Sequence, residues 1–533
     1  MDFCKSGLII AGLVVGLFLV ECGASEQPSQ GLARADRPNV IFIKTDDQRA
    51  DYLGCMGHPV IKTPNIDRLA AQGVLFENAF VTSAACTPSR TCFFTGRWER
   101  NHGVNFNSDS AITVEAFAQS WPMVLKRAGY FTGYVGKNHV PVGEGGYEGG
   151  SIEKAFDYWY GNHRHSYFYP KRPHPIYRNA AADTQIEIFE EGAMNFLSPN
   201  DKFLSGAKEF LQRRPTDKPF CLSVNFNVPH GAGTSSMKLL PKDPALYRTA
   251  YRDVIDQIPV PPTYLAEKDI KTPKIPRHVY NGKYISSYNY VKELATLQER
   301  QVRTCQTITG VDRLVGHLVD ELERLGLADN TIIIFSSDHG LLHGEHGLGG
   351  KCLLYEKAIH IPLIIYDPRL PVSQRGQRIR EFALSVDVAP TILLRCGVEI
   401  PSPVQGKSLW PLILGEKVEW RQDFFCENLL TRQNYPRVEA VRSHEWKYIR
   451  YFRRGDPIEA YADTLEASIR GEEPIYEELY HLTKDPHEEH NVAGDPGYSD
   501  TLEQYRQRIR KLVVEAKGGS GPPPTIPYFW KRR

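Results

Sequence analysis

Residues 39–48, NVIFIKTDDQ, join a nearly continuous apolar run to two adjacent carboxylates. Further β-branched or aromatic runs lie at residues 131–135, 220–226, 331–336 and 360–366. Helical stretches separate them, among them residues 121–129 and 293–325. Apolar strands that alternate with helices are typical of a parallel sheet with helices on both faces. The sequence therefore predicts an α/β fold built on a large mixed, mainly parallel sheet sandwiched by helices.

Reactive side chains follow four of these runs at the points where the runs end. They are Asp46 and Asp47, then Lys137 and His139, then His230, and finally Asp338 and His339. In open α/β sheets ligands bind beyond the carboxyl ends of the strands. We therefore expect these residues to meet at one edge of the sheet and to form the functional site there.

A second, smaller domain is predicted after about residue 418. Residues 440–452 alternate as a strand does, residues 478–482 form another short strand, and residues 500–517 form a charged amphipathic helix. We expect a catalytic domain at residues 37–418 and a C-terminal α+β subdomain with a short antiparallel sheet at residues 419–533. The tail from Gly518 is rich in glycine and proline, so we expect no regular structure there, only a surface strap or a loose end.

The N-terminus has the pattern of a secretory signal. Lys5 precedes an apolar run at residues 8–20, and small residues follow up to Ala24. That run is shorter than the roughly 20 residues that span a bilayer, and no later segment is apolar enough to do so. We predict a signal peptide at residues 1–24, export to the periplasm or the outside of the cell, and no integral membrane segment in the mature chain. Cys22 leaves a lipoprotein as a minority alternative, because Glu21 fits lipoprotein processing poorly.

Composition limits the class of partner. The 533 residues carry 64 Lys plus Arg against 63 Asp plus Glu, a net charge of +1. Such a balance argues against a nucleic-acid-binding surface, so any anionic ligand must be held by a local cluster of charge. No CxxC pair or zinc-type spacing occurs among the cysteines, which argues against a thiolate metal site.

The acidic residues favour a hard metal ion. Asp46, Asp47, Asp338 and His339 offer oxygen and imidazole ligands at strand ends, which suits a hard divalent cation. The alternative, that Asp46 and Asp47 merely cap a helix, is weaker because two adjacent acids are costly without a counter-cation.

One motif connects these features. Cys86-Thr87-Pro88-Ser89-Arg90, followed by TCFFTGR at residues 91–97, resembles the signature of type I sulfatases of the alkaline phosphatase superfamily. In that family the cysteine is converted to formylglycine, whose hydrated aldehyde is the nucleophile, by a formylglycine-generating maturation enzyme. Independently of the resemblance, Pro88 is typical of a first helical turn, and helix N-termini attract anions such as sulfate.

The resemblance also implies roles for individual residues. It implies catalytic roles for Cys86, Arg90, Lys137, His139, His230 and Lys351. It implies calcium, or sometimes magnesium, held by Asp46, Asp47, Cys86, Asp338 and His339. Lys137 would orient the formylglycine, His139 would take a proton from its second hydroxyl, and His230 would protonate the leaving alcohol. The position between this lysine and histidine is often aromatic in the family, whereas here it is Asn138. This difference puts in doubt whether the substrate of those relatives is also the substrate of this chain.

The implied reaction is hydrolysis of sulfate esters. We expect inserted segments of the chain to select the substrate. Residues 163–174, HRHSYFYPKRPH, mix cations with aromatics, and Arg432 and Arg437 lie in a Pro/Asn-rich loop. These features suit sulfated polysaccharide or glycosaminoglycan-derived sugars better than small aryl sulfates. The alternatives are a phosphonate monoester or phosphodiester hydrolase of the same superfamily and, ranked low, a non-catalytic carbohydrate-binding relative.

Overall fold

The computed structural model describes residues 37–106, 110–147, 149–163, 203–230, 249–281, 286–431, 434–453, 461–519 and 523–527. These residues belong to one compact unit, Leu32–Arg533. The predicted signal peptide, residues 164–174 and Arg432 lie outside the described ranges.

The predicted large sheet is present. In the described residues its eight strands have the order β12-β2-β11-β8-β1-β7-β5-β6. Their bounds are β1 Asn39–Asp46, β2 Val74–Phe76, β5 Phe131–Asn138, β6 Tyr158–His163, β7 Phe220–Pro229, β8 Thr331–Ser337, β11 Leu363–Tyr366 and β12 Gln377–Ile379. Neighbouring strands are parallel except that β11 is antiparallel to both β2 and β8. The predicted mixed, mainly parallel sheet is confirmed.

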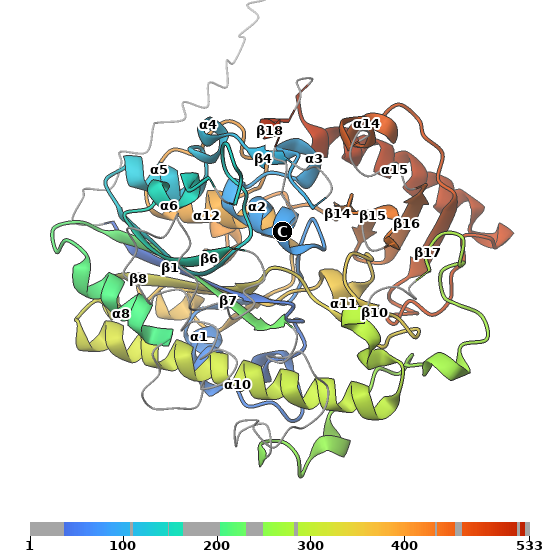
Figure 1. Ribbon diagram of the computed structural model, residues 1–533, viewed down its shortest axis with the longest axis horizontal. Coiled ribbons are helices and arrows are strands. Elements are labelled where there is room, and N and C mark those ends of the chain that lie inside the picture. The colour runs from blue at the N-terminus through green and yellow to red at the C-terminus, as the bar shows by residue number, and fades with distance from the viewer. Residues whose placement is uncertain are drawn as a thin grey trace, which may run out of the picture. The chain divides into compact units, whose positions relative to one another are not determined.

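Helices cover both faces of this sheet (Figure 1). The long α10 (Leu294–Arg324) contacts β7, α8 (Phe203–Arg213) and α1 (Pro64–Gln72), while α2 (Cys86–Thr95) contacts α5 (Trp121–Arg127) and α12 (Val388–Arg395). Side chains of a strand alternate between its faces. Accordingly Val40 and Phe42 join one hydrophobic cluster of the core, and Ile41 and Ile43 join the other. Both faces of β1 are buried, which explains its continuous apolar run.

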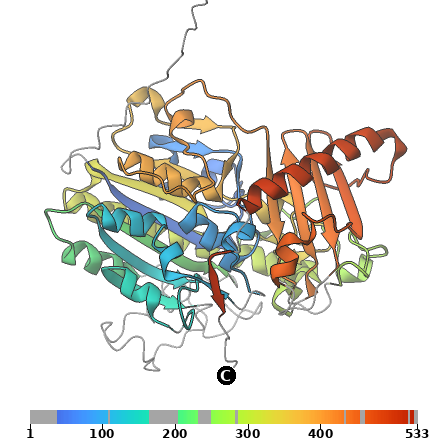
Figure 2. The same ribbon diagram turned by 90° about the horizontal axis from the view of Figure 1, so that it is seen from above.

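A four-stranded antiparallel sheet follows in the described residues, in the order β14-β15-β16-β17. Its strands are β14 Asp423–Asn428, β15 Arg437–Ser443, β16 Trp446–Phe452 and β17 Tyr476–His481. Helix α15 (Ser499–Lys517) contacts three of these strands and crosses the sheet in Figure 2. The predicted α+β character is confirmed, whereas the domain boundaries stay a prediction.

The prediction of one strand over residues 440–452 was wrong. The segment contains a hairpin, in which Ser443 Oγ accepts the Trp446 N–H at 3.0 Å and Arg442 pairs with Lys447. The turn was missed because the alternation of side chains continues across it. The prediction that Arg437 lies in a substrate loop was also wrong. This residue is in β15, where its guanidinium Nη2 lies 2.5 Å from a Glu472 carboxylate oxygen.

Part of the C-terminal tail forms the predicted strap, but the prediction that the tail has no regular structure was wrong, because three of its residues pair with a strand of the catalytic region. Strand β18 (Thr525–Pro527) pairs antiparallel with β4 (Ser110–Ile112), and Ile112 bridges to Val142. The other elements are short: β3 Ala79–Phe80, β9 Leu342–His343, β10 Gly349–Gly350, β13 Ala383–Leu384, α3 Glu99–His102, α4 Val114–Phe117, α6 Ser151–Ala155, α11 Glu356–Ile359, α13 Trp410–Ile413, α14 Tyr461–Ala467 and several 3-10 turns.

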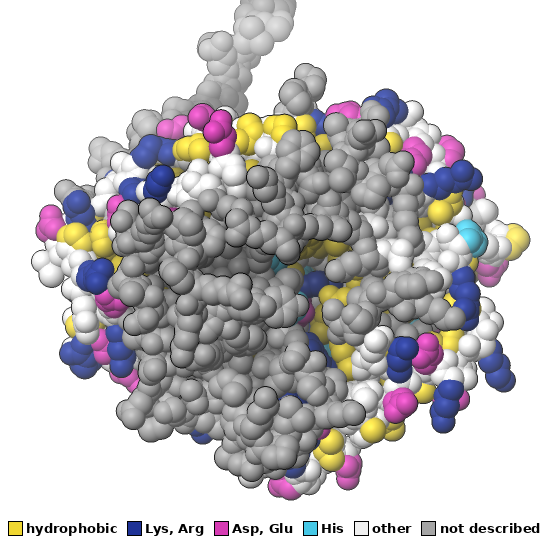
Figure 3. Space-filling view, viewed as in Figure 1, with side chains coloured by type: hydrophobic (Ala, Val, Ile, Leu, Met, Phe, Trp, Pro, Cys, Tyr) yellow, Lys and Arg dark blue, Asp and Glu magenta, His cyan; other side chains and the backbone are white. Residues whose placement is uncertain are grey.

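Charge is spread rather than gathered on the face shown in Figure 3. Lys and Arg side chains are interspersed with Asp and Glu over its described part. Within the described ranges, no helix is both long enough and apolar enough to cross a membrane.

Candidate active site

The sheet register brings the ends of four strands to the same level. Thr45 at the end of β1 pairs with Ser337 of β8, and Asp46 pairs with Pro229 of β7. Gly136 of β5 pairs with Asn225 of β7. The residues that follow these positions are therefore neighbours in space. All ten predicted site residues are described, and they are buried except His230, whose side chain is 25% exposed.

Cys86 is the first residue of helix α2, as the sequence predicts. The preceding Ala85 is extended, at φ −139° and ψ 145°, and the Ser89 N–H donates to the Ala85 carbonyl at 2.9 Å. Pro88 fits in this first turn because the turn's N–H groups lack intrahelical partners. The helix ends at Gly96, whose φ of 66° suits glycine. Cys86 thus lies at the positive end of the helix dipole.

Four side chains form a compact group of possible metal ligands. One ligand atom from each of Asp46, Asp47, Cys86 and His339 lies within 4.8 Å of the others. Asp338 lies beside this group, and its Oδ1 accepts the Asp47 N–H at 3.2 Å. Asp47 has a φ of 64°, a left-handed conformation that aspartate tolerates better than most residues. The donor set is rich in carboxylate oxygen and fits a hard divalent cation.

Two lysines flank the carboxylates. The Lys351 ammonium lies 2.8 Å from Cys86 Sγ, 2.9 Å from Asp47 Oδ1 and 3.3 Å from His339 Nε2. Lys137 forms an ion pair with Asp46. Cys86 Sγ is also 3.2 Å from His339 Nε2. Positive charge therefore surrounds the position at which a bound anion would contact residue 86.

Arg90 connects helix α2 to the strand ends. Its Nε donates to Asp338 Oδ2 at 2.9 Å, and its Nη2 lies 3.4 Å from Asp46 Oδ2. We expected Arg90 to hold the modified residue or oxygens on the metal side of the site. It contacts two carboxylates of the predicted metal-ligand set, and this orients them.

The two histidines lie at the rim of the cluster. His230 Nε2 is 3.7 Å from Asp47 Oδ2. The His139 ring packs edge-on at 5.5 Å from Phe106, and its carbonyl accepts from the Tyr147 hydroxyl at 3.2 Å. Tyr147 also lies 3.0 Å from the Thr87 hydroxyl, so it connects His139 to the first turn of α2.

The electrostatics of the cluster favour ionised carboxylates. Burial by itself raises the pKa of Asp47, but Lys351, His230 and His339 outweigh it, and the pKa is lowered. Asp46 behaves in the same way, with Lys137 and Arg90 opposing burial to lower its pKa. These acids are therefore poised as anionic ligands.

Sequence reasoning missed two buried polar residues here. Lys44 of β1 is fully buried. Among the described residues its ammonium has no hydrogen-bond partner, and it lies 5.0 Å from the ring centroids of Phe93 and Phe94. Asn225 of β7 accepts from Arg90 Nη1 at 3.5 Å. The available signal was a polar residue inside each buried strand, Lys44 in NVIFIKTD and Asn225 in FCLSVNFNVP.

Comparison with protein families agrees with this geometry. Residues 38–398 match the family described as Sulfatase, and residues 344–467 match N-sulphoglucosamine sulphohydrolase, C-terminal. The chain belongs to the sulfatase family. It is a sulfuric ester hydrolase of the alkaline phosphatase superfamily, and enzymes of this family use formylglycine and a metal ion.

Two relatives align with nearly the whole sulfatase chain. It is 27% identical to N-acetylglucosamine-6-O-sulfatase of Bacteroides thetaiotaomicron over 90% of this chain and 87% of that protein. It is also 27% identical to iduronate 2-sulfatase of Mus musculus, over 93% of this chain and 97% of that protein.

Solved structures share the fold. One, in complex with its substrate D-glucosamine-2-N,6-O-disulfate, has a TM-score of 0.65 and 24% identity, covering 91% of this chain and 99% of that one. Phosphonate monoester hydrolase of Silicibacter pomeroyi has a TM-score of 0.67 and 22% identity, covering 90% and 96%. At these identities the likeness shows the fold alone.

Proposed function

We propose that this sulfatase removes sulfate from sulfated carbohydrates of polysaccharide or glycosaminoglycan origin, with residue 86 in its formylglycine form. The observation that carries the proposal is the convergence of Lys351, Asp47 and His339 on Cys86 at the start of α2. Two aligned relatives have names that specify sulfated sugars, which supports the substrate class.

Asp46, Asp47, Asp338 and His339 would hold the metal together with residue 86. We propose Ca²⁺, with Mg²⁺ as the alternative, because the set is dominated by carboxylate oxygens and contains no cluster of thiolates. When both groups are present, the hydrated aldehyde supplies the nucleophile and the metal polarises the sulfate oxygens.

The cationic side chains would bind and orient the sulfate. Lys351 is placed to contact both residue 86 and a sulfate oxygen, since its ammonium already lies 2.8 Å from Cys86 Sγ. Lys137 neutralises Asp46, and we propose that it also orients residue 86. Arg90 keeps Asp338 and Asp46 in place. Prealigned charges of this kind stabilise a transition state without reorganisation.

The histidines would move protons. His230 Nε2, at the exposed rim, is placed to donate a proton to the leaving alcohol oxygen as its S–O bond breaks. We propose that His139 takes a proton at residue 86, which lets the sulfate group depart. Burial lowers the pKa of His230 to about 4 and holds the pKa of His139 well below its usual value, so both imidazoles are neutral bases in the free enzyme. The negative charge of a bound sulfate would raise the pKa of His230 and so favour its role as a proton donor.

We also propose that the chain is exported after removal of residues 1–24, with lipidation at Cys22 as the alternative. Before folding is complete, Cys86 would be the substrate of a formylglycine-generating enzyme. Residues 37–418 and 419–533 would be the catalytic domain and the C-terminal subdomain.

The decisive test measures residue 86 and its chemistry together. The intact mass of the peptide that carries residue 86 should show conversion of cysteine to aldehyde, with reactivity towards a carbonyl probe. The matured enzyme should hydrolyse 6-O- or 2-O-sulfated monosaccharides, and Asp46→Ala should abolish turnover without unfolding the chain. Wild-type turnover by an unmodified Cys86 protein would refute the proposed nucleophile.

The phosphonate monoester alternative is tested in the same assay. We expect sulfate-ester turnover to exceed turnover of phosphonate monoesters and phosphodiesters by the same preparation. The opposite ranking would favour the superfamily alternative. Binding of sulfated sugar with no turnover by the aldehyde form would favour the non-catalytic alternative.

A further inference from the structure

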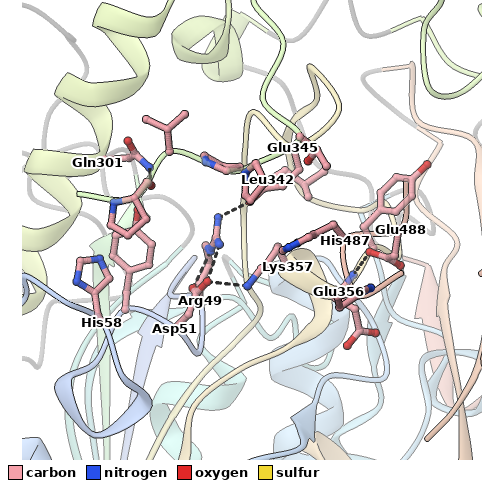
Figure 4. Close-up of a pocket in the computed structure, with 18 of the residues that line it drawn as sticks. Arg49, Asp51, His58, Gln301, Leu342, Glu345, Glu356, Lys357, His487 and Glu488 are labelled. Carbon is pink, nitrogen blue, oxygen red and sulfur yellow. Dashed lines mark hydrogen bonds and ion pairs between the residues drawn. The ribbon is translucent and has the colours of Figure 1, made fainter. Parts of the chain in front are cut away.

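One cavity, of about 240 Å³, is lined by residues other than the predicted catalytic ones (Figure 4). Its described lining comes from the loop after β1, residues 259–263, helix α10, the β9–β10 hairpin, α11 and residues 486–488. None of the ten predicted site residues is among these described lining residues. The cavity is therefore a separate feature that the sulfatase reaction does not explain.

The charged side chains that line the cavity are already paired with one another. Arg49 makes a two-point contact with Asp51, at 2.8 and 2.6 Å, and donates to Glu345 at 2.7 Å. Lys357 donates to Asp51 at 2.8 Å. Figure 4 shows this chain of contacts between Arg49, Asp51 and Lys357. These paired side chains can still form further hydrogen bonds, because an ammonium has three N–H groups and a carboxylate accepts up to four hydrogen bonds.

The charges that line the cavity are compensated. Asp51 and Glu345 pair with Arg49 and Lys357, and the other two carboxylates of the described lining, Glu356 and Glu488, pair with Lys447. Glu356 also contacts Arg442 at 3.2 Å. Among the described lining residues, a sulfate or carboxylate group would therefore find no cation that lacks a carboxylate partner, whereas uncharged hydroxyl groups can both donate to carboxylates and accept from Lys357.

Much of the remaining lining is apolar. Five prolines line the cavity, together with the side chains of Tyr52 and Tyr355; the prolines are Pro59, Pro259, Pro261, Pro262 and Pro486. Pro59, Pro259 and Pro486 are exposed, and Tyr52 and Tyr355 are buried. The volume is just below the roughly 300–1,000 Å³ of pockets for drug-sized ligands. One six-membered ring with hydroxyl groups matches this size, with its C–H faces against the prolines and tyrosines.

We propose that this cavity binds an uncharged sugar ring and serves as a carbohydrate site separate from the reaction centre. The ring is either a free monosaccharide or one unsulfated unit of a polysaccharide. The inference rests on the proposed function only if the ring belongs to a polysaccharide, because the residues that line the cavity take no part in the proposed reaction.

The test measures binding of uncharged sugars directly. Saturation-transfer NMR is recorded with glucose, galactose and N-acetylglucosamine, and with the uncharged tetrasaccharide of N-acetylglucosamine. Pro486→Trp fills the cavity from an exposed position, and Lys484→Trp, also exposed but not among the described lining residues, is the matched control. Thr263→Phe, from the opposite wall, serves if Pro486→Trp fails to fold.

We expect at least one of these sugars to give a signal with the wild type and Lys484→Trp, and a signal at least fivefold weaker with Pro486→Trp or Thr263→Phe. Tighter binding of the tetrasaccharide than of the monosaccharide supports the site and identifies a polysaccharide source, and equal binding supports it with a free sugar. No signal from any sugar, or an equal signal after the cavity is filled, overturns the proposal. Because no sulfate is cleaved, failure here is distinct from failure of the sulfatase assay.

Discussion

Two buried clusters of charged side chains differ in how their charges are compensated. Around Arg100 of α3, the guanidinium contacts Glu427 at 2.7 Å and Glu439 at 2.6 Å, and it also donates to the Leu465 carbonyl. At the reaction centre, one ligand atom from each of four residues lies within 4.8 Å of the others, and the Lys351 ammonium contacts three of these residues. We call the first cluster closed because protein groups compensate its charges, and the second open because its donors are of the kinds that would bind a divalent cation. Burial of charge alone therefore does not identify a functional site.

The largest effect is expected from a substitution that removes the proposed nucleophile from the open cluster. Cys86→Ala leaves no group that can become formylglycine, so we expect turnover of sulfated sugars to fall by at least about 10⁴-fold. The midpoint of thermal unfolding should change by only a few degrees, because a small buried side chain is replaced by a smaller one. Parallel activity and unfolding measurements check this. Residual activity within tenfold of the wild type would contradict the role of residue 86.

Breaking the closed cluster should affect stability instead. Arg100→Ala leaves Glu427 and Glu439 buried without this partner, so the free energy of unfolding should fall by about 3–5 kcal/mol. Denaturant unfolding measures the change, and kcat per folded molecule should stay near the wild-type value. Arg508→Ala is the matched control, because its pair with Asp423 is partly exposed and such pairs contribute about 0–1 kcal/mol. Equal losses in both variants would argue against the closed cluster as a major source of stability.

Lys351→Ala tests whether charge at the edge of the open cluster serves catalysis. Removing one prealigned donor should lower kcat about 10²–10³-fold. The free energy of unfolding should also fall, because Lys351 pairs with the buried Asp47 at 2.9 Å, so kcat is compared per folded molecule. The exposed Lys484→Ala is the control. Near-wild-type kcat in Lys351→Ala would refute the proposed site. A variant that fails to fold would show that Lys351 is needed for stability.

The smallest expected effect concerns a single buried carboxyl group, Glu478 of β17. Burial raises the pKa of Glu478 to about 7, although the Tyr451 and Tyr355 hydroxyls donate to it. The folded state therefore retains this proton longer than the unfolded state, whose group titrates near its usual 4.5. The contribution of Glu478 to stability is full below about pH 4.5 and is lost as pH rises to 7.

Glu478→Gln should remove this pH dependence. The stability of the variant relative to the wild type should rise between pH 5 and 7 and then level off, by up to about 3 kcal/mol at 1.36 kcal/mol per pKa unit. Unfolding curves at several pH values measure the difference. Glu445→Gln, at an exposed position, is the control. A flat difference across this range would show that Glu478 is ionised in the folded protein at pH 5.

Much of the site was predictable because its residues follow apolar runs. The runs at β1, β5, β7 and β8 marked the strands, and the sheet rule placed Asp46, Lys137, His230 and Asp338 at one edge. Arg90 was predicted as a site residue, but its contact with Asp338 was not, because the two residues are 248 positions apart. The hairpin at Ser443 was missed because side-chain alternation continues through the turn.

The sequence alone determined the α/β class and indicated the candidate nucleophile and the set of acidic and cationic residues, because strand periodicity and short motifs are local properties. Only the tertiary structure decided which charges pair. It placed Lys351 against both Cys86 and Asp47, assigned Arg437 to an ion pair, and formed the proline-lined cavity. These features depend on distances between segments far apart in the chain, and such distances are set by packing of the whole core.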